Sequence, residues 1–358
     1  MESLYTIAKQ HFETKEIMKN LLSAHKALAE LKWVSKILPN EEILINTLSL
    51  QEAKDSSEVE NIITTHDELY QSNVDKKTFA TIWAKEVYNY VDALMTTYHS
   101  VKKSQLIMNK DILKAQSLIE HNDAWFRKIA GTELKNEKTW KTVYTPPQNP
   151  KEILDLMSDF EKYLNDSDTW HDSLINVALL HYQFESIHPF YDWNGRVWRI
   201  INILYIVKEW LLDSPILYLS RYINQNKSEY YRYLQDIRDN NNWNDWILFI
   251  LTAIEKTSKQ TIDIINWIKD MMLSQKHIIR EKLPKIYSQT LLNNTFKHPY
   301  TKIEFIMDDL WCSRPSAMKY LDQLIGIWIL RKEKKWKENF YINVELFDFL
   351  KNIPNLER

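Results

Sequence analysis

The sequence predicts a mainly α fold: a helical bundle with a β-hairpin flap, an N-terminal helical region and a C-terminal winged helix-turn-helix. Apolar residues recur at helical spacing through most of the 358 residues, and strands do not alternate with helices as in a parallel sheet. With 44% hydrophobic and 13% aromatic residues, the chain can bury more than one core. At about 150 residues per domain, we expect two or three domains.

Eight long segments have the apolar spacing of amphipathic helices. They are residues 4–29, 78–98, 108–129, 151–165, 171–187, 196–211, 227–240 and 245–273. Residues 139–150 (TWKTVYTPPQNP) interrupt this pattern, since Trp140, Thr142 and Tyr144 alternate with other residues and two prolines follow. Such a run predicts a short hairpin or an extended flap.

The C-terminal segment contains shorter elements. Residues 285–295, 303–310 and 315–325 indicate three helices, and residues 327–331 and 340–344 indicate paired strands. Helices followed by a two-stranded wing are typical of a winged helix-turn-helix. The sequence therefore predicts an N-terminal helical region over 1–100, a central domain over 101–275 and a winged helix over 283–358.

Composition narrows the classes of partner. The chain carries 46 Lys and Arg against 48 Asp and Glu, so no chain-wide positive field makes nucleic acid the default partner. Cys312 is the only cysteine and cannot form an internal disulfide. The first residues lack a signal-peptide pattern, and no apolar run approaches the roughly 18 residues of a membrane span. We expect a cytoplasmic protein that does not enter a membrane.

The segment His188–Arg199, HPFYDWNGRVWR, has the residue types of a phosphate-transfer site. Pro189 disfavours helix at the residue before it, and an apolar-periodic run follows, so the segment is a loop that leads into a helix N-terminus. That terminus, with Arg196 and Arg199 one turn apart, attracts phosphate. Asp192 is a hard oxygen ligand that suits Mg²⁺, and His188 is a candidate general base. Each residue alone has an ordinary structural explanation, but the ordered set favours chemistry.

The segment resembles the active-site motif of the Fic/DOC family, HPFx(D/E)GNGRxxR. The matches are His188, Pro189, Phe190, Asp192, Asn194, Gly195, Arg196 and Arg199. Flanking residues 139–150, 181–187 and 227–246 are also similar to family segments, and a C-terminal winged helix accompanies some members. The resemblance implies a Fic-type helical bundle that transfers AMP from ATP to a hydroxyl side chain of a protein.

The resemblance also implies site roles. His188 would be the base, Asp192 would hold Mg²⁺, and Phe190 would anchor the loop. Asn194, Gly195, Arg196 and Arg199 would bind the ATP phosphates, and the flap residues Val143, Tyr144 and Thr145 would align the target. Tyr230 or Tyr231 would face adenine, although core packing explains these tyrosines equally well. Transfer of phosphate itself is a neighbouring chemistry, but relatives that perform it usually carry lysine at the position of Gly195.

A second segment resembles the family's inhibitory motif, (S/T)xxxE(G/N). Ser56, Glu60 and Asn61 match its three defined positions. We expect a short helix capped by Ser56 that presents Glu60 to Arg199, where the carboxylate would occupy the guanidinium and repel the γ-phosphate. In some relatives the matching glutamate also supports removal of AMP.

Trp193 and Trp198 depart from the family pattern. Position 193 is glycine in the motif, and an indole there adds bulk and makes positive φ costly, so we expect weak or absent activity in this chain. Only three glycines occur where about 25 are typical, beside 14 tryptophans. Trp33, Trp328 and Trp336 also stand where glycine would be natural. We hypothesise that several tryptophans replace ancestral glycines, through engineering or a sequence error.

A different class of function stays open. Residues 331–337, RKEKKWK, hold five basic residues and one acid, so the winged helix could bind DNA while the Fic-like region acts as a sensor. A solvated turn or a protein-docking module explains the same residues. A self-target and a homodimer are further partners that the resemblance leaves open. His181, seven residues before His188, lacks nearby metal ligands and is expected to pack or hydrogen-bond.

Overall fold

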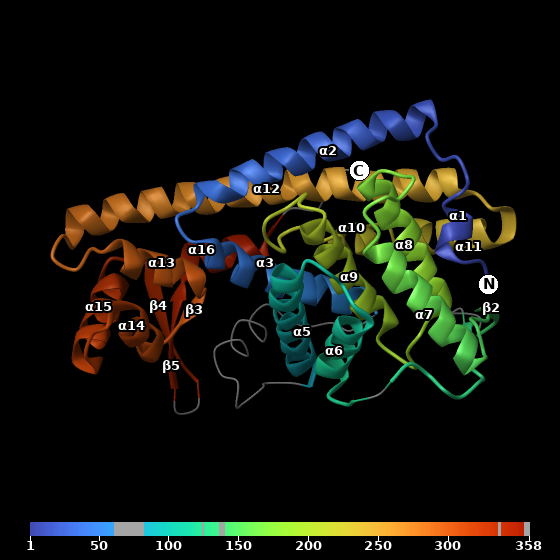
Figure 1. Ribbon diagram of the computed structural model, residues 1–358. Helices are drawn as coiled ribbons and strands as arrows, with labels where there is room; N and C mark the ends of the chain where they lie inside the picture. The colour runs from blue at the N-terminus through green and yellow to red at the C-terminus, as the bar shows by residue number, and fades with distance from the viewer. Residues whose placement is uncertain (61–81, 124, 136–139, 336–337, 354–358) are drawn as a thin grey trace. The chain divides into compact units, whose positions relative to one another are not determined.

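The computed structural model describes residues 1–60, 82–123, 125–135, 140–335 and 338–353, and every structural statement concerns these residues. Most of them lie in helices, with two small antiparallel sheets (Figure 1). The predicted class, a helical bundle with a β-hairpin, is confirmed. None of the described helices has the length and apolar content needed to cross a membrane.

The elements follow one another in this order. They are α1 (Leu4–Ile7), α2 (Lys15–Val34), the 3₁₀ helix η1 (Ser35–Ile37), α3 (Glu41–Val59), α5 (Ile82–Ser104), α6 (Asn109–Glu120), β1 (Leu134–Lys135), β2 (Thr142–Tyr144), α7 (Pro150–Leu164), α8 (Ser173–Ile187), α9 (Asn194–Lys208), α10 (Ser220–Gln225), α11 (Lys227–Asn240), α12 (Trp243–Lys282), α13 (Gln289–Lys297), β3 (Tyr300–Thr301), α14 (Ile303–Leu310), α15 (Arg314–Gly326), β4 (Leu330–Lys335), β5 (Glu338–Asn343) and α16 (Val344–Lys351).

The chain forms two compact units. The first contains Met1–Ala29, Asp55–Ile62 and Asn89–Ser258, and the second contains Glu30–Lys54, Ile63–Tyr88 and Lys259–Arg358. Four helices, α2, α3, α5 and α12, have residues in both units. The three-part division over 1–100, 101–275 and 283–358 stays a prediction.

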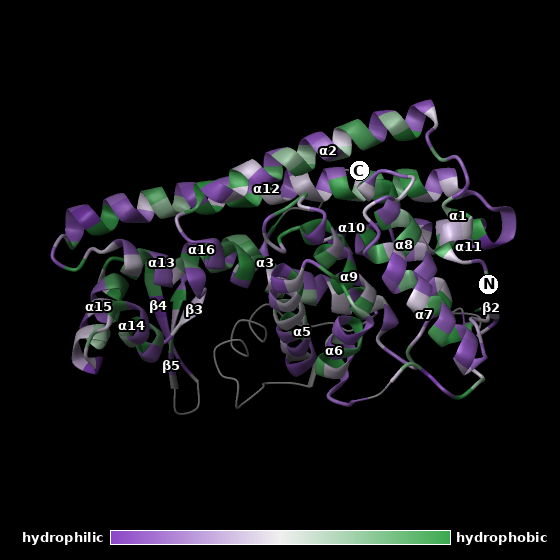
Figure 2. Cartoon of the chain, in the orientation of Figure 1, coloured by the Kyte–Doolittle hydropathy of each residue, from purple (hydrophilic) through white to green (hydrophobic). Residues whose placement is uncertain are grey.

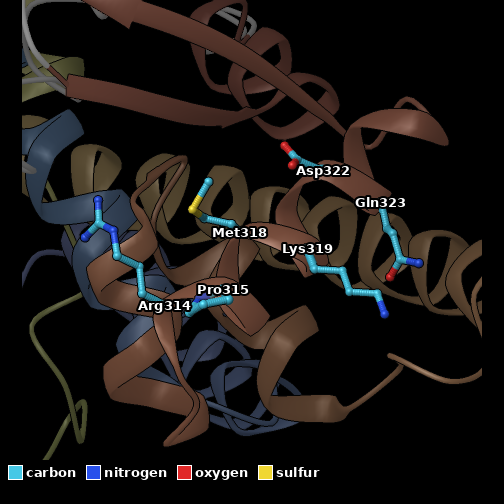
Figure 3. Close-up of a pocket in the computed structure, with 6 residues that line it drawn as sticks. All are labelled: Arg314, Pro315, Met318, Lys319, Asp322 and Gln323. Atoms are coloured by element: carbon cyan, nitrogen blue, oxygen red, sulfur yellow. The ribbon is translucent and has the colours of Figure 1, made fainter.

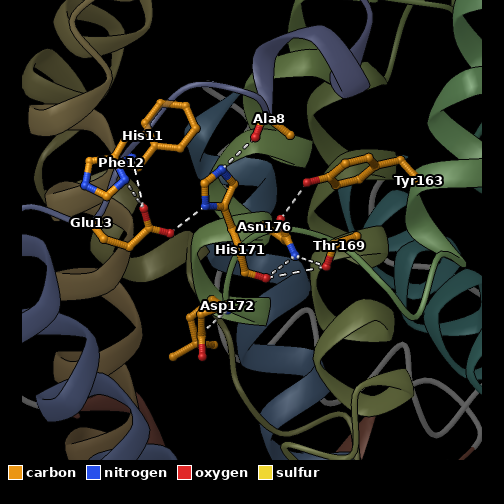
Figure 4. Close-up of polar contacts among 10 residues, drawn as sticks. Ala8, His11, Phe12, Glu13, Tyr163, Thr169, His171, Asp172 and Asn176 are labelled. Atoms are coloured by element: carbon orange, nitrogen blue, oxygen red, sulfur yellow. Dashed lines mark hydrogen bonds and ion pairs between the residues drawn. The ribbon is translucent and has the colours of Figure 1, made fainter.

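The N-terminal residues form two helices, so the prediction of one helix over residues 4–29 is wrong. The chain between α1 and α2 is held by His171, which precedes α8 (Figure 4). The ring nitrogens of His171 lie 2.6 Å from Glu13 Oε1 and 2.9 Å from the carbonyl oxygen of Ala8. Phe12 is buried against the same ring. Burial of Phe12 and the contacts of His171 therefore stabilise this break between the two helices.

The core of the first unit lies around α8 and α9. Almost every residue of these two helices is buried, which explains their weak amphipathic pattern. By contrast, hydrophobic and hydrophilic residues alternate in patches along the long helix α12 (Figure 2). The helix predicted over residues 108–129 ends early, at Glu120, because His121 takes a left-handed conformation. The residues after it form the loop that contacts the functional site.

The second unit ends in a small mixed domain. α13, α14 and α15 are followed by the hairpin β4–β5, and β3 adds to β5 to complete a three-stranded sheet in the order β3-β5-β4. The hairpin register pairs Leu330 with Asn343 and Glu333 with Phe340. The three helices and the hairpin occur where the sequence predicts them, within a few residues. The two-residue strand β3 and the final helix α16 carry too little pattern to be predicted.

A surface hollow lies on α15, in the second unit. Six side chains line it: Arg314, Pro315, Met318, Lys319, Asp322 and Gln323 (Figure 3). These residues share one face of the helix, at positions about one turn apart. The hollow combines two cations, one acid and one thioether, so it has no marked preference for one class of ligand.

The Glu13–His171 contact generates a pH prediction. Burial opposes ionisation of Glu13, but the hydrogen bond and charge of His171 together with backbone hydrogen bonds outweigh it and lower the pKa of Glu13. A carboxylate with a lowered pKa stabilises the fold above its unfolded pKa and loses that contribution as pH falls through the folded pKa. We expect Glu13→Gln to reduce the free energy of unfolding at pH 7, by about 1 kcal/mol, and the deficit to vanish below about pH 4. Urea unfolding at several pH values measures this, with the exposed Glu16→Gln as control; equal deficits at pH 3 and pH 7 would contradict it.

Candidate functional site

The motif loop joins α8 to α9 through two left-handed residues. His188 caps the C-terminus of α8 with φ 49° and ψ 60°, and its N–H donates to the carbonyl oxygen of Phe184 at 2.9 Å. Trp193 precedes α9 with φ 69° and ψ 7°. The first turn of α9 then carries Asn194, Gly195 and Arg196. The prediction of a loop leading into a helix N-terminus is confirmed.

The side chain of Asn194 fixes the shape of the loop. Its Nδ2 donates to the carbonyl oxygen of Phe190 and its Oδ1 accepts from the N–H of Phe190, both at 2.9 Å. The ring of Phe190 is buried against Phe126 and Phe184, as expected of an anchor. Both ends of the Asn194 amide are engaged by the loop, so this residue acts first as a brace, and its predicted contact with phosphate stays a prediction.

Arg127 is a site residue that the sequence does not reveal. Its Nε donates to the carbonyl oxygen of His188 at 2.8 Å, and its Nη2 donates to that of Ile187 at 3.3 Å. Nη2 also donates to the carbonyl oxygen of Pro147, at the end of the flap. Arg127 is buried and ties the flap to the start of the motif loop. Only backbone atoms accept these bonds, so no partner residue type marks the contact in the sequence.

Arg199 is held by Ser56 and Glu60, as the inhibitory motif predicts. Its Nε donates to Ser56 Oγ at 2.7 Å, and its Nη2 donates to the Ser56 carbonyl oxygen and to Glu60 Oε1, both at 2.9 Å. Arg199 is 4% exposed, whereas the Glu60 side chain is 38% exposed. Nε and Nη2 of the cation are therefore bound to this segment, while the carboxylate retains access to solvent.

The predicted short helix capped by Ser56 is wrong. Ser56 lies in the last turn of the 19-residue helix α3, which ends at Val59, and Glu60 follows in the turn. The Ser56 hydroxyl does not need to cap a helix start, because it accepts from Arg199 instead. The third motif residue, Asn61, lies outside the described residues.

Charge reinforces the Arg199–Glu60 contact. Burial opposes ionisation of Glu60, but the charge of Arg199 and the hydrogen bond from it outweigh burial and lower the pKa of Glu60. Burial likewise opposes the charge of Arg199, and Glu60 outweighs it and raises the pKa of Arg199. Both groups are thus charged at neutral pH.

Two further groups near this pair have shifted pKa values. Burial, with a smaller effect of the Arg127 charge, lowers the pKa of His188 to about 4, although the Glu60 charge acts in the opposite direction. The imidazole is therefore neutral at pH 7, the form in which it can accept a proton. Burial and the charge of Glu60 raise the pKa of Glu185 to about 7. Glu185, three residues before His188, was not among the predicted site residues.

Gly195 allows Glu60 to reach the start of α9. A Cβ at position 195 would collide with Glu60 Oε1 and would lie 3.1 Å from an Nη atom of Arg199. Next to it, the guanidinium carbon of Arg196 lies 3.5 Å from the ring centroid of Trp193. The anion-binding terminus predicted from the sequence is therefore approached by a carboxylate and covered in part by an indole.

Asp192 is exposed on the motif loop, and its Oδ1 accepts from the N–H of Trp193 at 2.8 Å. No cluster of three or more His, Cys, Asp or Glu that could hold a metal occurs among the described residues. Mg²⁺ often binds through one or two carboxylates together with substrate phosphates. One exposed carboxylate beside an anion site fits that pattern, so Asp192 is a suitable ligand for Mg²⁺ when it is bound with phosphate.

The two tyrosines differ in exposure. Tyr230 is buried, and its hydroxyl lies 2.8 Å from His181 Nε2, which agrees with the packing role expected for His181. Tyr231 is 48% exposed. Tyr230 therefore packs in the core, which was the alternative explanation for the two tyrosines. The contact with adenine stays a prediction, and Tyr231 is the one of the two whose ring is accessible.

The flap contains β2, which pairs with β1, so the hairpin begins before the predicted segment 139–150 and only its second strand lies within it. Val143 and Thr145 are exposed, whereas Tyr144 is half-buried. The Tyr144 hydroxyl donates to the carbonyl oxygen of Ser186 at 3.0 Å, and the Arg238 guanidinium carbon lies 3.8 Å from its ring centroid. Tyr144 thus fixes the flap beside the end of α8, and the residues on either side of it face solvent.

Three family models match the chain. Residues 18–99 match "Fic/DOC family N-terminal", residues 112–206 match "Fic/DOC family", and residues 271–346 match "Protein adenylyltransferase SoFic-like, C-terminal domain". Together they cover the inhibitory segment, the motif loop and the C-terminal domain. The models therefore agree with the resemblance seen in the motif.

Curated relatives and solved structures point the same way. A protein adenylyltransferase Fic of Culex quinquefasciatus is 24% identical over 268 residues, which are 72% of this chain and 48% of that protein. One of Drosophila sechellia is 30% identical over 163 residues, 44% of this chain and 29% of that protein. The chain thus matches about a third to a half of these relatives' length.

Two solved structures support the fold. The crystal structure of a Fic family protein from Desulfovibrio desulfuricans G20 has a TM-score of 0.57 at 17% identity and covers 93% of this chain and 97% of that one. Fic-1 (aa134 - 508) from C. elegans has a TM-score of 0.54 at 18% identity and covers 70% of this chain and 73% of that one. At these identities the likeness concerns the fold alone.

The raised pKa of Glu185 generates a second pH prediction. A carboxyl group whose folded pKa is raised to about 7 stabilises the fold below its unfolded pKa, and this contribution is lost as pH rises through about 7. We expect the free energy of unfolding to fall by roughly 1–3 kcal/mol between about pH 5 and pH 8 relative to Glu185→Gln. Urea unfolding of both proteins measures the difference. The exposed acid variant Glu30→Gln serves as control, and parallel pH curves for Glu185→Gln and the parent would contradict the prediction.

Proposed function

Because the chain belongs to the Fic/DOC family, we propose that it is a protein adenylyltransferase that transfers AMP from ATP to a Ser, Thr or Tyr hydroxyl of a protein. The observation that carries the proposal is the motif loop between α8 and α9. A neutral His188 begins the loop, and Arg196 and Arg199 occupy the first turns of the following helix. A base beside an anion site is what transfer at a phosphorus centre requires.

The reaction uses this chain's groups as follows. His188 accepts the proton of the target hydroxyl while its oxygen bonds to the α-phosphorus, and the bond to the β-phosphate oxygen breaks to release pyrophosphate. Arg199 and the N–H groups at the start of α9 hold the phosphates. The exposed flap residues Val143 and Thr145 lie beside the fixed Tyr144 and offer backbone edges to a target segment.

ATP is the co-substrate that this function needs, and Asp192 would hold Mg²⁺. When bound, the ion supplies positive charge against the negative phosphates and fixes their orientation. Asp192 is exposed on the motif loop, where a carboxylate and phosphate oxygens could share an ion.

The contact of Glu60 with Arg199 supports auto-inhibition. Three hydrogen bonds occupy the guanidinium, and the carboxylate reaches the backbone at Gly195, where a phosphate would otherwise bind. The Glu60 carboxylate and a phosphate bound at the same place would both be negatively charged and would repel each other. ATP would therefore bind in a reactive position only after Glu60 leaves Arg199.

Release of Glu60 should raise transfer, and loss of the base should abolish it. We expect Glu60→Gly to increase AMP transfer about 10- to 100-fold, since a hydrogen-bonded ion pair no longer competes with phosphate. Adding His188→Ala to that variant should lower transfer about 10²- to 10⁴-fold. Transfer of label from α-phosphate-labelled ATP to protein, with mass spectrometry for added AMP, measures both effects.

Matched variants control for general effects of substitution. Glu30→Gly removes an exposed acid from the helix α2, and His277→Ala removes an exposed histidine from α12. Both should leave transfer within twofold of their parent. Equal label transfer by Glu60→Gly with and without His188→Ala would overturn the role of His188.

One observation favours DNA binding as a second candidate function, with the Fic region acting as a sensor. Three basic side chains, Arg331, Lys332 and Lys334, are exposed along β4, although Arg331 also pairs with Glu333 at 2.9 Å. An exposed basic strand can follow a phosphate backbone. This function and the transferase function use different residues and can be tested separately.

DNA binding predicts a strong salt dependence. If the three cations neutralise three phosphates, the affinity of the full chain for duplex DNA should fall about 40-fold between roughly 50 and 200 mM salt. Lys332→Glu with Lys334→Glu should remove most of the binding, and Lys110→Glu with Lys114→Glu on α6 should not. Fluorescence anisotropy measures the binding, and equal affinities for both double variants would exclude this function.

A further inference from the structure

Tryptophan is concentrated at left-handed backbone positions. Nine non-glycine residues of the described chain have positive φ, and five are tryptophans: Trp140 (57°), Trp193 (69°), Trp210 (58°), Trp311 (51°) and Trp328 (66°). Tryptophan makes up 14 of the 358 residues, so chance would place fewer than one among nine such positions. Left-handed backbone is disfavoured for bulky side chains and is the usual place of glycine.

The surroundings of these positions also suit glycine. Trp311 follows the last residue of α14 in left-handed conformation, the place where helices very commonly end with glycine. Its side chain is 92% exposed, and that of Trp328 is 89% exposed. Tryptophan is normally largely buried, because its ring gains most from leaving water. At these positions the indole adds backbone strain without burial to offset it.

Two other tryptophans behave as tryptophan should. Trp243 and Trp246 are 4% and 0% exposed. Their indole N–H groups donate to Asn241 Oδ1 at 2.8 Å and to the carbonyl oxygen of Ala178 at 2.9 Å. These two tryptophans are fitted to their environment, whereas the five left-handed ones are placed where glycine is expected.

We infer that residues 140, 193, 210, 311 and 328 are glycine in the protein as its own cell makes it, whereas residues 243 and 246 are tryptophan. One variant of the genetic code reads the codon UGA as tryptophan and another reads it as glycine, whereas both read UGG as tryptophan. Reading UGA as tryptophan in place of glycine would therefore put tryptophan at glycine positions and leave the UGG positions unchanged. The same division accounts for part of the glycine deficit, because five further glycines would raise the count from three to eight.

The inference has a consequence at the motif loop. The Trp193 ring lies 3.5 Å from the Arg196 guanidinium carbon, so the indole covers a cation of the anion site. Glycine at 193 keeps the left-handed turn and uncovers that cation. This consequence rests on the proposed nucleotide site, whereas the other four positions are independent of it.

The first experiment reads the codons of the gene and the peptide masses of the protein purified from its own cells. We expect UGA codons and glycine masses at the five left-handed positions, and UGG codons and tryptophan masses at 243 and 246. Tryptophan masses at the five positions would overturn the inference.

The second experiment measures the thermal stability of the full chain in which all 14 tryptophans of the sequence are present. Trp210→Gly, Trp311→Gly and Trp328→Gly should each raise the folded-to-unfolded ratio about 5- to 30-fold, through relief of left-handed strain. Trp267→Gly is the matched control, since Trp267 is also exposed but lies inside α12, where glycine destabilises a helix. A rise for Trp267→Gly equal to the others would show that removal of an exposed indole, not backbone conformation, is responsible, and would overturn the argument.

A third measurement separates the inference from the proposed function. Trp193→Gly should raise ATP affinity at least tenfold in the Glu60→Gly background, as measured by calorimetry. Glycine masses at the five positions, together with no ATP binding, would contradict the proposed nucleotide site but not the inference about glycine. Tryptophan masses together with AMP transfer by the Glu60→Gly chain would leave the function standing and overturn the inference.

Discussion

The contacts of one buried cation, Arg199, are central to the arrangement of the site. Arg199 is almost completely removed from solvent, and a buried charge is tolerated only when it is paired and hydrogen-bonded. In this structure the oxygens of Ser56 and Glu60 meet that need. Because Ser56 lies on α3 and is itself buried, the bonds to Ser56 can persist when Glu60, which is partly exposed, moves away. The exposed member of the pair is therefore the one suited to exchange with a phosphate.

The position of the loop depends on backbone hydrogen bonds rather than on charges. Asn194 closes the loop on the backbone of Phe190, and Arg127 binds the carbonyl oxygens that end α8. The charges of Arg127, Glu60 and Arg238 act on the His188 ring in opposite directions, and burial has the largest effect on its pKa. The same packing that shapes the loop thus keeps the imidazole neutral at physiological pH.

The sequence predicts the parts of this structure that have a strong local signal. Helices with clear apolar spacing occur where the sequence predicts them, and α11 and α14 agree in both bounds, whereas α6 ends nine residues earlier and α12 nine residues later than predicted. The long helix α3 was missed, because most of its residues are buried on every side and its amphipathic pattern is weak. The break between α1 and α2 depends on His171, more than 150 residues away in sequence, and no local pattern reveals it.

The site shows the same division between local and distant information. The motif residues follow one another in the chain, so their chemistry could be recognised from sequence order alone. Arg127 contacts only backbone atoms, and Glu185 becomes unusual only through burial and the charge of Glu60. The roles of Arg127 and Glu185 depend on which elements pack together. That packing cannot be read from the residues next to them in the sequence.

Glycine matters both at the contact of Glu60 with α9 and at the tryptophan positions. At 195 the absence of a side chain lets a carboxylate approach the start of α9, and at 193 the backbone needs a left-handed turn that glycine adopts without strain. Both positions border the same anion-binding terminus. An indole at 193 therefore interferes with phosphate in two ways, by strain in the turn and by covering Arg196, whereas the contact of Glu60 with Arg199 does not involve residue 193. The contact of Glu60 with Arg199 can form with either residue at 193, whereas the proposed phosphate site would be uncovered only by the smaller one.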